Sequence, residues 1–369
     1  MASKKIFIIS GEASGDLHAA NLVRELNNLD ASLTIAGWGG DRLKAEGVEI
    51  KKHIRELAFM GFQEVILNIR TILRNFKICK SQILEFQPDV LILIDYPGFN
   101  LRIAEWAKAN NIRVFYYISP QIWAWKQSRV FKIKASVEKM YCILPFEKAF
   151  YDKFGVEVTY LGHPLLDETN RYKVSENTSL KTDEKPILAI LAGSRKQEIE
   201  RKLPVMLEAA THFKNYRILV ACAPNLDKSY YEKYQTVGVE FVQGLTYSVL
   251  NHASIAIVTS GTATLETALF NVPQVVCYKS SSVSYWIARM LVKIKYISLV
   301  NLILNKNAVA ELIQGECTVE SIVKELKLIE EGQTGRNEMM QSYSELVHLL
   351  GDNGASHRVA LNMLENLKK

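Results

Sequence analysis

Short apolar runs alternate with stretches of helical periodicity along most of the chain. Continuous apolar runs of about four to eight residues are typical of strands buried on both faces of a parallel sheet, and amphipathic stretches between them are typical of crossover helices. The first half therefore predicts a doubly wound parallel α/β sheet. The predicted strands are residues 5–10, 34–36, 90–95 and 114–118, and helices are predicted at residues 17–28 and 101–110.

The same alternation restarts after a polar interruption at residues 167–185, which has almost no apolar periodicity and is typical of a linker. A chain of 369 residues is long for one domain, so two domains are expected. We expect a Rossmann-like domain at residues 1–166 and a second one at residues 186–369, both facing one cleft. The predicted strands of the second domain are residues 186–191, 217–221, 253–259 and 274–278, and the sequence is helical and charged from residue 318 onward.

Composition narrows the class of protein. A hydrophobic content of 48% with 23% charged residues is an ordinary globular profile, and no stretch approaches the roughly 18 apolar residues of a spanning helix. Residues 1–5 lead straight into a strand without the apolar core of a signal peptide. The five cysteines have no metal-binding spacing, so we expect reduced thiols in a cytoplasmic protein. The net charge of +6 suits an anionic substrate or membrane surface, but the basic residues are too scattered to indicate nucleic-acid binding.

Ligands of doubly wound sheets bind at the carboxyl ends of the strands, so the turns there are the candidate sites. The first turn, SGEASGD, leads from a strand into a helix and brings backbone N–H groups near a ligand, which suits phosphate or sugar oxygens. An ordinary βα connection is the alternative. The candidate residues of this acceptor side are Gly11, Glu12, Ser14, Gly15 and Asp16.

Two turns in the second half favour an anion. Ser260, Gly261 and Thr262 are expected at a helix N-terminus, where backbone donors and the helix dipole attract negative charge. Arg195, in the turn Gly193–Ser194–Arg195, offers a planar cation for a diphosphate. Glu266 could accept hydrogen bonds from ribose hydroxyls. Each has a structural alternative, namely a helix cap, a surface ion pair and a helix-face charge, but together they favour a nucleotide diphosphate site.

Asp95 ends a continuous apolar strand, where folding requires no carboxylate. It is a candidate general base, with helix capping as the alternative role. His163 could face the cleft or be a structural histidine. The sequence lacks the P-loop, the G-x-S-x-G nucleophile elbow and the G-x-G-x-x-G motif. Its seven histidines form no ligand cluster, so no metal is expected.

An apolar stripe at helical spacing precedes the strand that ends in Asp95, with basic residues on a neighbouring face. Such a stripe usually faces a core. A basic amphipathic helix can also dock on a membrane surface, so both interpretations stay open on these residues alone. The candidate docking residues are Phe62, Val65, Ile66, Ile69, Arg70, Leu73 and Arg74.

Several longer motifs resemble the lipid-A-disaccharide synthases. They are SGEASGDLH, MGFQEV, ISPQIWAWKQSRVFKI, LPFEKAFYDKFGV, LGHPLLD, GSR and SGTATLE, and they extend over most of the chain. The resemblance implies a GT-B glycosyltransferase that joins the 2,3-diacylglucosamine of a UDP-sugar to 2,3-diacylglucosamine 1-phosphate. The products are UDP and the β-1,6-linked disaccharide 1-phosphate of the lipopolysaccharide pathway in Gram-negative bacteria.

The resemblance also implies roles for residues. The second domain would hold UDP, Asp95 would be the base, Arg195 would stabilise the departing diphosphate, and Asn301 matches a family asparagine near the UDP-sugar. Many relatives have a second acid where this chain has Gly98, which leaves Asp95 as the candidate base. It further implies no metal or other cofactor, peripheral location on the inner face of the inner membrane, and a swapped homodimer. Because the implied substrates are lipids, we favour membrane docking over a core-facing role for the basic amphipathic stripe. The alternatives are another GT-B enzyme, such as a UDP-N-acetylglucosamine transferase or 2-epimerase, and a non-catalytic nucleotide-sugar-binding protein.

Overall fold

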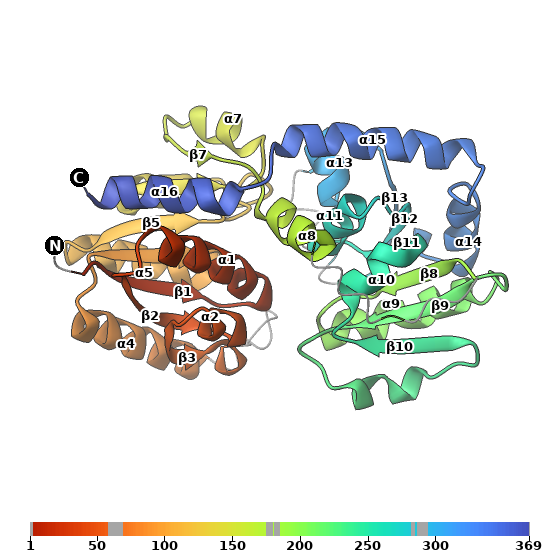
Figure 1. Ribbon diagram of the computed structural model, residues 1–369, viewed down its shortest axis with the longest axis horizontal. Helices are drawn as coiled ribbons and strands as arrows, with labels where there is room; N and C mark the ends of the chain where they lie inside the picture. The colour runs from red at the N-terminus through yellow and green to blue at the C-terminus, as the bar shows by residue number, and fades with distance from the viewer. Residues whose placement is uncertain are drawn as a thin grey trace. The chain divides into compact units, whose positions relative to one another are not determined.

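The computed structural model describes residues 3–57, 69–174, 180, 185–281, 285 and 294–368. The chain divides into two compact units. The first unit comprises Met1–Asp167 and Asp352–Lys369, and the second comprises Glu168–Gly351. Each unit has its own parallel sheet with helices on both faces (Figure 1). The predicted fold class, two parallel-sheet α/β domains, is therefore confirmed.

The first unit begins with a strand, a turn and a long helix, and this pattern recurs. Its elements are β1 (Lys5–Ser10), α1 (Ala13–Leu29), β2 (Thr34–Gly39), α2 (Asp41–Ala45), β3 (Glu49–His53), η1 (Ile54–Glu56), α4 (Ile69–Phe86), β4 (Val90–Ile94), α5 (Pro97–Ala109), β5 (Arg113–Tyr117), α6 (Arg129–Ser136), β6 (Lys139–Cys142), α7 (Glu147–Asp152), β7 (Thr159–Tyr160) and α16 (Ala355–Leu367). Helix α8 (Pro164–Val174) spans the boundary between the units.

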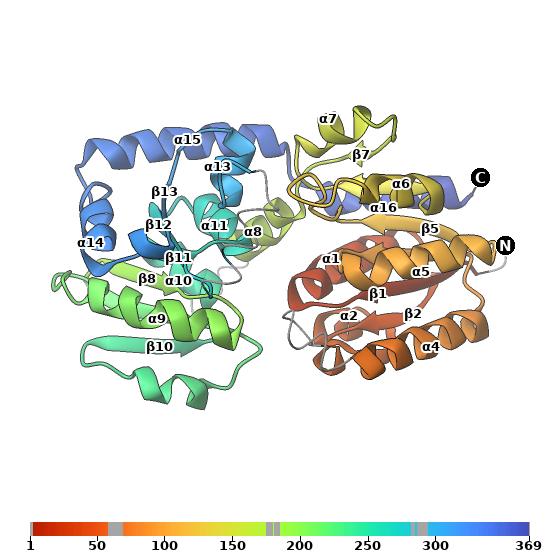
Figure 2. The same ribbon diagram turned by 180° about the vertical axis from the view of Figure 1, so that it is seen from behind.

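The sheet of the first unit has the strand order β3-β2-β1-β4-β5-β6-β7 among the described residues. Side chains alternate across it: Phe7 and Ile9 pack toward α4, α5 and α6, whereas Ile6 and Ile8 pack toward α1 and α16. Figures 1 and 2 view these two faces in turn. Both faces are buried, which explains why the central strands are continuous apolar runs.

The second unit repeats the design with the described strand order β10-β9-β8-β11-β12-β13. Strands β11 and β12 have the predicted bounds. The elements are β8 (Ile187–Leu191), α9 (Lys196–Ala210), β9 (Arg217–Cys222), η2 (Lys228–Tyr234), β10 (Val239–Gln243), α10 (Thr246–His252), β11 (Ala253–Thr259), α11 (Thr262–Leu269), β12 (Gln274–Tyr278), α13 (Leu299–Leu304), β13 (Ala310–Ile313), η3 (Gln314–Glu316), α14 (Val319–Lys327) and α15 (Thr334–Leu350).

The domain boundaries differ from the expected ones at two places. Helix α16 was expected in the second domain, but its apolar side chains complete the core of the first unit beside α1. The Asp167 carboxylate accepts hydrogen bonds from the backbone N–H groups of Gly354, Ala355 and Ser356, which caps α16. Part of the expected linker is helix α8, and Leu180 is buried in the core of the second unit. An amphipathic pattern shows that a helix has a buried face but not which sheet it covers.

Candidate functional site

The turns after β1 and β4 leave the sheet side by side, because the register pairs Ser10 with Ile94. The Tyr96 ring lies so close to Gly11 that a Cβ there would be 2.4 Å from it, so only glycine fits. Helix α1 starts at Ala13 and exposes Ser14 in its first turn. The backbone N–H groups of such a turn have no partners within the helix and point toward a ligand.

Asp95 stands directly after β4 in the left-handed backbone region, with φ 45°, and Tyr96 follows with φ 49°. The strained turn is held by its own carbonyl: the Asp95 backbone oxygen accepts from the Tyr116 hydroxyl at 2.6 Å and from Asn100 Nδ2 at 2.8 Å. The N-cap of α5 is Tyr96, so Asp95 does not occupy the capping position. Burial, reinforced by the negative charge of Glu12, raises the pKa of Asp95 to about 7. This carboxyl can exchange a proton near neutral pH.

Asp16 has a structural role at the start of α2. It is buried, and its carboxylate accepts from the backbone N–H groups of Gly40 at 2.6 Å and Arg42 at 3.1 Å, where α2 begins. A Cβ on Gly15 would lie 3.5 Å from the Cβ of Ser10, an ordinary van der Waals contact, so the packing of α1 on the sheet does not itself require glycine here. The hydroxyl of Ser10 is buried and has no hydrogen-bond partner among the described residues.

His163 is a buried, neutral residue. Its Nδ1 accepts from the backbone N–H of Leu165 at 3.2 Å, and burial lowers its pKa to about 3. His18, which the sequence did not single out, is also buried, and burial lowers its pKa to about 4. These properties match the structural alternative for His163.

In the second unit, the turn after β8 contains Gly193 with φ 114°, and Arg195 is the N-cap residue of α9. A Cβ on Gly193 would lie 2.5 Å from a carboxylate oxygen of Glu198, so the glycine makes room for this side chain. Arg195 Nη1 lies 3.3 Å from Glu198 Oε1, and the arginine side chain is about half exposed. Asn225 Nδ2 donates to the Ser194 carbonyl oxygen at 3.0 Å. The turn is thus anchored while its cation remains accessible.

The turn after β11 has the same form. Gly261, with φ 134°, is the N-cap residue of α11, and the Ser260 hydroxyl donates to the Ile297 carbonyl oxygen at 2.8 Å. Glu266, one turn into α11, accepts from the Tyr247 hydroxyl at 2.8 Å. β8 and β11 are neighbouring parallel strands, so both anion-friendly turns lie at the same edge of this sheet.

Asn301 is fully buried and hydrogen-bonded within the unit. Its Nδ2 donates to the Val309 carbonyl oxygen at 2.9 Å and to Glu311 Oε1 at 2.8 Å, and its Oδ1 accepts from the Ala308 N–H at 2.7 Å. Glu311 also accepts from the backbone N–H of Ile297, the residue that holds Ser260. Asn301 is therefore linked to the Ser260 turn through Glu311 and Ile297.

The sequence analysis missed Lys202 in α9. The side chain is buried, and its Nζ donates to the hydroxyl of Thr259, the last residue of β11. The signal was a lysine in the apolar stripe of Ile199, Leu203 and Met206, where a hydrophobic residue is expected.

Helix α4 buries one part of the apolar stripe and exposes another part. Phe76 faces the core, with its ring 4.3 Å from that of Phe99, whereas Leu73 is 55% exposed beside exposed Arg70 and Arg74. Leu84, 53% exposed, lies three turns beyond Leu73 on the same face. Phe62, Val65 and Ile66 lie outside the described residues, as does the side chain of Ile69.

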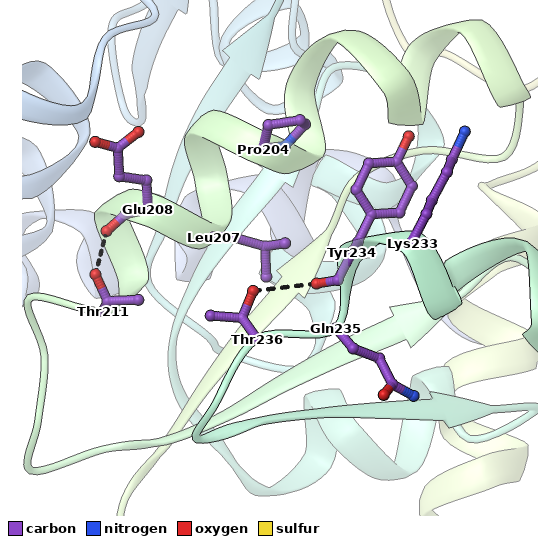
Figure 3. A pocket seen from close by; sticks show the side chains of 8 residues that line it. All are labelled: Pro204, Leu207, Glu208, Thr211, Lys233, Tyr234, Gln235 and Thr236. Atoms are coloured by element: carbon purple, nitrogen blue, oxygen red, sulfur yellow. Dashed lines mark hydrogen bonds between the residues drawn. The ribbon is translucent and has the colours of Figure 1, made fainter.

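Three further observations concern the described part of the chain. It contains no helix long and apolar enough to span a membrane. It contains no cluster of three or more His, Cys, Asp or Glu side chains suited to a metal ion. A shallow hollow of about 380 Å³ lies between α9 and η2, and Figure 3 shows that its lining includes none of the predicted site residues.

Comparisons with known proteins agree with the two-unit fold. The chain is similar to the glycotransferase of kitacinnamycin, with a TM-score of 0.67, 12% identity and 99% of each chain covered. It is also similar to the UDP-N-acetylglucosamine 2-epimerase of Neisseria meningitidis, with a TM-score of 0.63, 12% identity, and 99% of this chain and 100% of that chain covered. Likeness at such low identity shows the fold alone, which is GT-B.

Sequence comparison identifies the family. The family model described as lipid-A-disaccharide synthetase matches residues 6–361. The lipid-A-disaccharide synthase of Myxococcus xanthus is 41% identical over 374 residues, with 98% of this chain and 97% of the relative covered. That of Syntrophus aciditrophicus is 41% identical over 384 residues, with 100% and 99% covered. The chain belongs to the lipid-A-disaccharide synthase family of glycosyltransferases.

Proposed function

We propose that the protein transfers 2,3-diacylglucosamine from its UDP derivative to the 6-hydroxyl of 2,3-diacylglucosamine 1-phosphate, with inversion at the anomeric carbon. The products are UDP and the β-1,6-linked disaccharide 1-phosphate. The observation that carries this proposal is the full-length match to lipid-A-disaccharide synthases at 41% identity. The chemistry of the two units supports it.

The second unit would bind the donor. The turn Gly193–Arg195 and the turn Ser260–Thr262 offer backbone N–H groups at the starts of α9 and α11, and Arg195 adds a full positive charge. These groups would stabilise the charge that develops on the departing diphosphate. A carboxylate accepts several hydrogen bonds, so Glu266 can bind ribose hydroxyls while it retains the bond from Tyr247. Asn301 would contribute to the UDP-sugar site by holding the backbone next to Ser260.

The first unit would bind the acceptor and supply the base. An acceptor hydroxyl is a weak nucleophile at neutral pH, and a carboxylate with a pKa of about 7 is well matched to remove its proton. We assign this role to Asp95. The N-terminus of α1, with Gly11 and Ser14, suits the phosphate oxygens of the acceptor, and the Glu12 carboxylate can accept hydrogen bonds from its sugar hydroxyls. The Ser10 hydroxyl, which has no hydrogen-bond partner among the described residues, is a further polar group at this turn.

The substrates carry acyl chains, so we propose that the protein works at the inner face of the inner membrane. The face of α4 with Arg70, Leu73, Arg74, Lys77 and Leu84 is exposed, and its combination of cations and leucines suits an anionic lipid surface. We also propose that the protein forms the swapped homodimer that the family resemblance implies.

The reaction as proposed needs no metal ion, because Arg195 and the helix N-termini supply the positive charge. We therefore predict that activity persists in excess EDTA after dialysis. Loss of activity under EDTA that magnesium or manganese restores would contradict this proposal.

The function is tested by incubating the purified protein with both acylated substrates and measuring UDP release together with the mass of the lipid product. UDP and a disaccharide 1-phosphate are expected only when both substrates are present. Conversion of UDP-N-acetylglucosamine without an acceptor would indicate an epimerase. Binding of UDP without any turnover would indicate a nucleotide-sugar-binding protein, and either result would overturn the proposal.

A further inference from the structure

Lys202 is a buried lysine within the second unit, with 2% of its surface exposed; burial lowers its pKa, and the negative charge of Glu198 acts in the opposite direction. Lysine is almost never fully buried unless it is paired, because removing an ammonium group from water is costly. Lys202 Nζ donates to the Thr259 hydroxyl, a neutral partner. The charged and titratable groups that act on it are Glu198 and Arg195 at the start of its own helix, Cys277 on β12, and Cys317 directly after η3.

The position of Lys202 connects the two turns of the donor site. It lies on α9, the helix that begins at the Gly193–Arg195 turn, and it contacts the last residue of β11, which leads into the Ser260–Thr262 turn. The backbone N–H of Ser260 donates to the Cys277 carbonyl oxygen at 3.3 Å, so β12 holds Thr259 and Ser260 on one side and Lys202 of α9 contacts Thr259 on the other. A hydrophobic side chain would fill the same space at less cost in free energy.

We propose that Lys202 is a positioning residue for the nucleotide diphosphate: it fixes Thr259 at the base of the Ser260–Thr262 turn and adds a positive charge behind both turns. This inference rests on the proposed function of the second unit as the UDP site. A buried charge is screened little by salt, so it acts on a diphosphate through the protein without touching it. The nucleoside part of the ligand carries no charge and gains nothing from it.

The test compares the binding of UDP and uridine by calorimetry to wild-type protein and to Lys202→Met, which keeps the length of the side chain and removes the charge. We expect UDP binding to weaken at least about 5-fold, also at high salt, while uridine binding is retained. The melting temperature should stay the same or rise, since a buried charge is replaced by an apolar group. Equal weakening of UDP and uridine, or unchanged UDP binding, would overturn the inference.

Three variants complete the test. Lys202→Arg retains the charge and should retain the preference for UDP, which keeps the inference testable if Lys202→Met does not fold. Thr259→Val removes the hydrogen bond but not the charge, so the preference should be largely kept; complete loss would contradict the role of the charge. Leu203→Ala, a neighbouring core change, should lower stability without separating UDP from uridine. If wild-type protein binds no UDP, the proposed function itself fails, which is a different result.

Discussion

At the scale of single residues, Asp95 is the most informative position. Asp95→Asn keeps the shape, tolerates the left-handed backbone and removes the basicity. We expect turnover to fall at least about 100-fold with UDP binding unchanged. The kcat/KM of the wild-type protein should fall as the pH drops below about 7, because the carboxyl becomes protonated. A variant with normal turnover would remove Asp95 from the mechanism.

The same substitution has a predicted effect on stability. Folding raises the pKa of Asp95 from 3.8 to about 7, so between these pH values the native state binds more protons than the unfolded state. Stability from this group is complete at low pH and is lost as the pH rises through 7. Asp95→Asn should therefore be more stable than wild type at pH 8, by roughly 2–4 kcal/mol. Glu147, whose pKa burial also raises to about 7, is common to both proteins and cancels in the comparison. Urea unfolding at pH 5 and pH 8 measures the difference.

A substitution at Arg195 tests the proposed UDP-sugar site of the second unit. Arg195→Ala should lower kcat at least about 100-fold, because developing diphosphate charge loses its strongest partner. The arginine is about half exposed, so its loss should leave the melting temperature almost unchanged. Arg201→Ala removes an exposed cation from the same helix and serves as the matched control. If both variants lose activity equally, the effect is one of general charge rather than of this position.

At the scale of elements, the sequence predicted most of the central strands and missed edge strands, together with the short strand β6 between β5 and β7. β1, β11 and β12 are buried apolar runs and were found with their observed bounds. β3 and β10 were missed because edge strands are half exposed and mix polar with apolar residues.

The site could be predicted to a similar extent. The strand-end turns were visible as small polar residues after apolar runs. Local sequence does not show that Asp16 caps α2 or that Asn301 is hydrogen-bonded to Glu311, because both contacts join segments distant in the chain or in different elements. Lys202 was missed because its contact with Thr259 joins helix α9 to strand β11, which are distant in the sequence.

Helix α4 allows a test of membrane docking that does not disturb the core. Leu73→Ser with Leu84→Ser changes two exposed side chains, so the protein should stay folded and lose binding to vesicles containing anionic phospholipid. Phe131→Ser, on α6, changes an aromatic residue that is 62% exposed and is the control. Flotation with vesicles measures the bound fraction. Unchanged flotation of the double variant, or equal release of Phe131→Ser, would contradict docking through α4.

At the scale of the whole molecule, the first unit depends on α16, and Asp167 ties the two segments together. Asp167→Ala removes a carboxylate that accepts three backbone hydrogen bonds, so we expect a loss of about 1–2 kcal/mol of stability. Hydrogen exchange should accelerate in β1 and α1 and stay unchanged in the second unit. Asp352→Ala, near the same turn, is the control. Uniform acceleration in both units would contradict this division.

The split of the first unit into two sequence segments also bears on how the chain folds as it is synthesised. The second unit is one uninterrupted segment, so all of its strands leave the ribosome before α16 does. Until then, one face of the first sheet, with Ile6 and Ile8, lacks the cover of Val359 and Met363. Domains usually complete folding in the order of translation. We expect the opposite order here: the second unit can finish folding first, and the first unit, which contains Asp95, waits for α16.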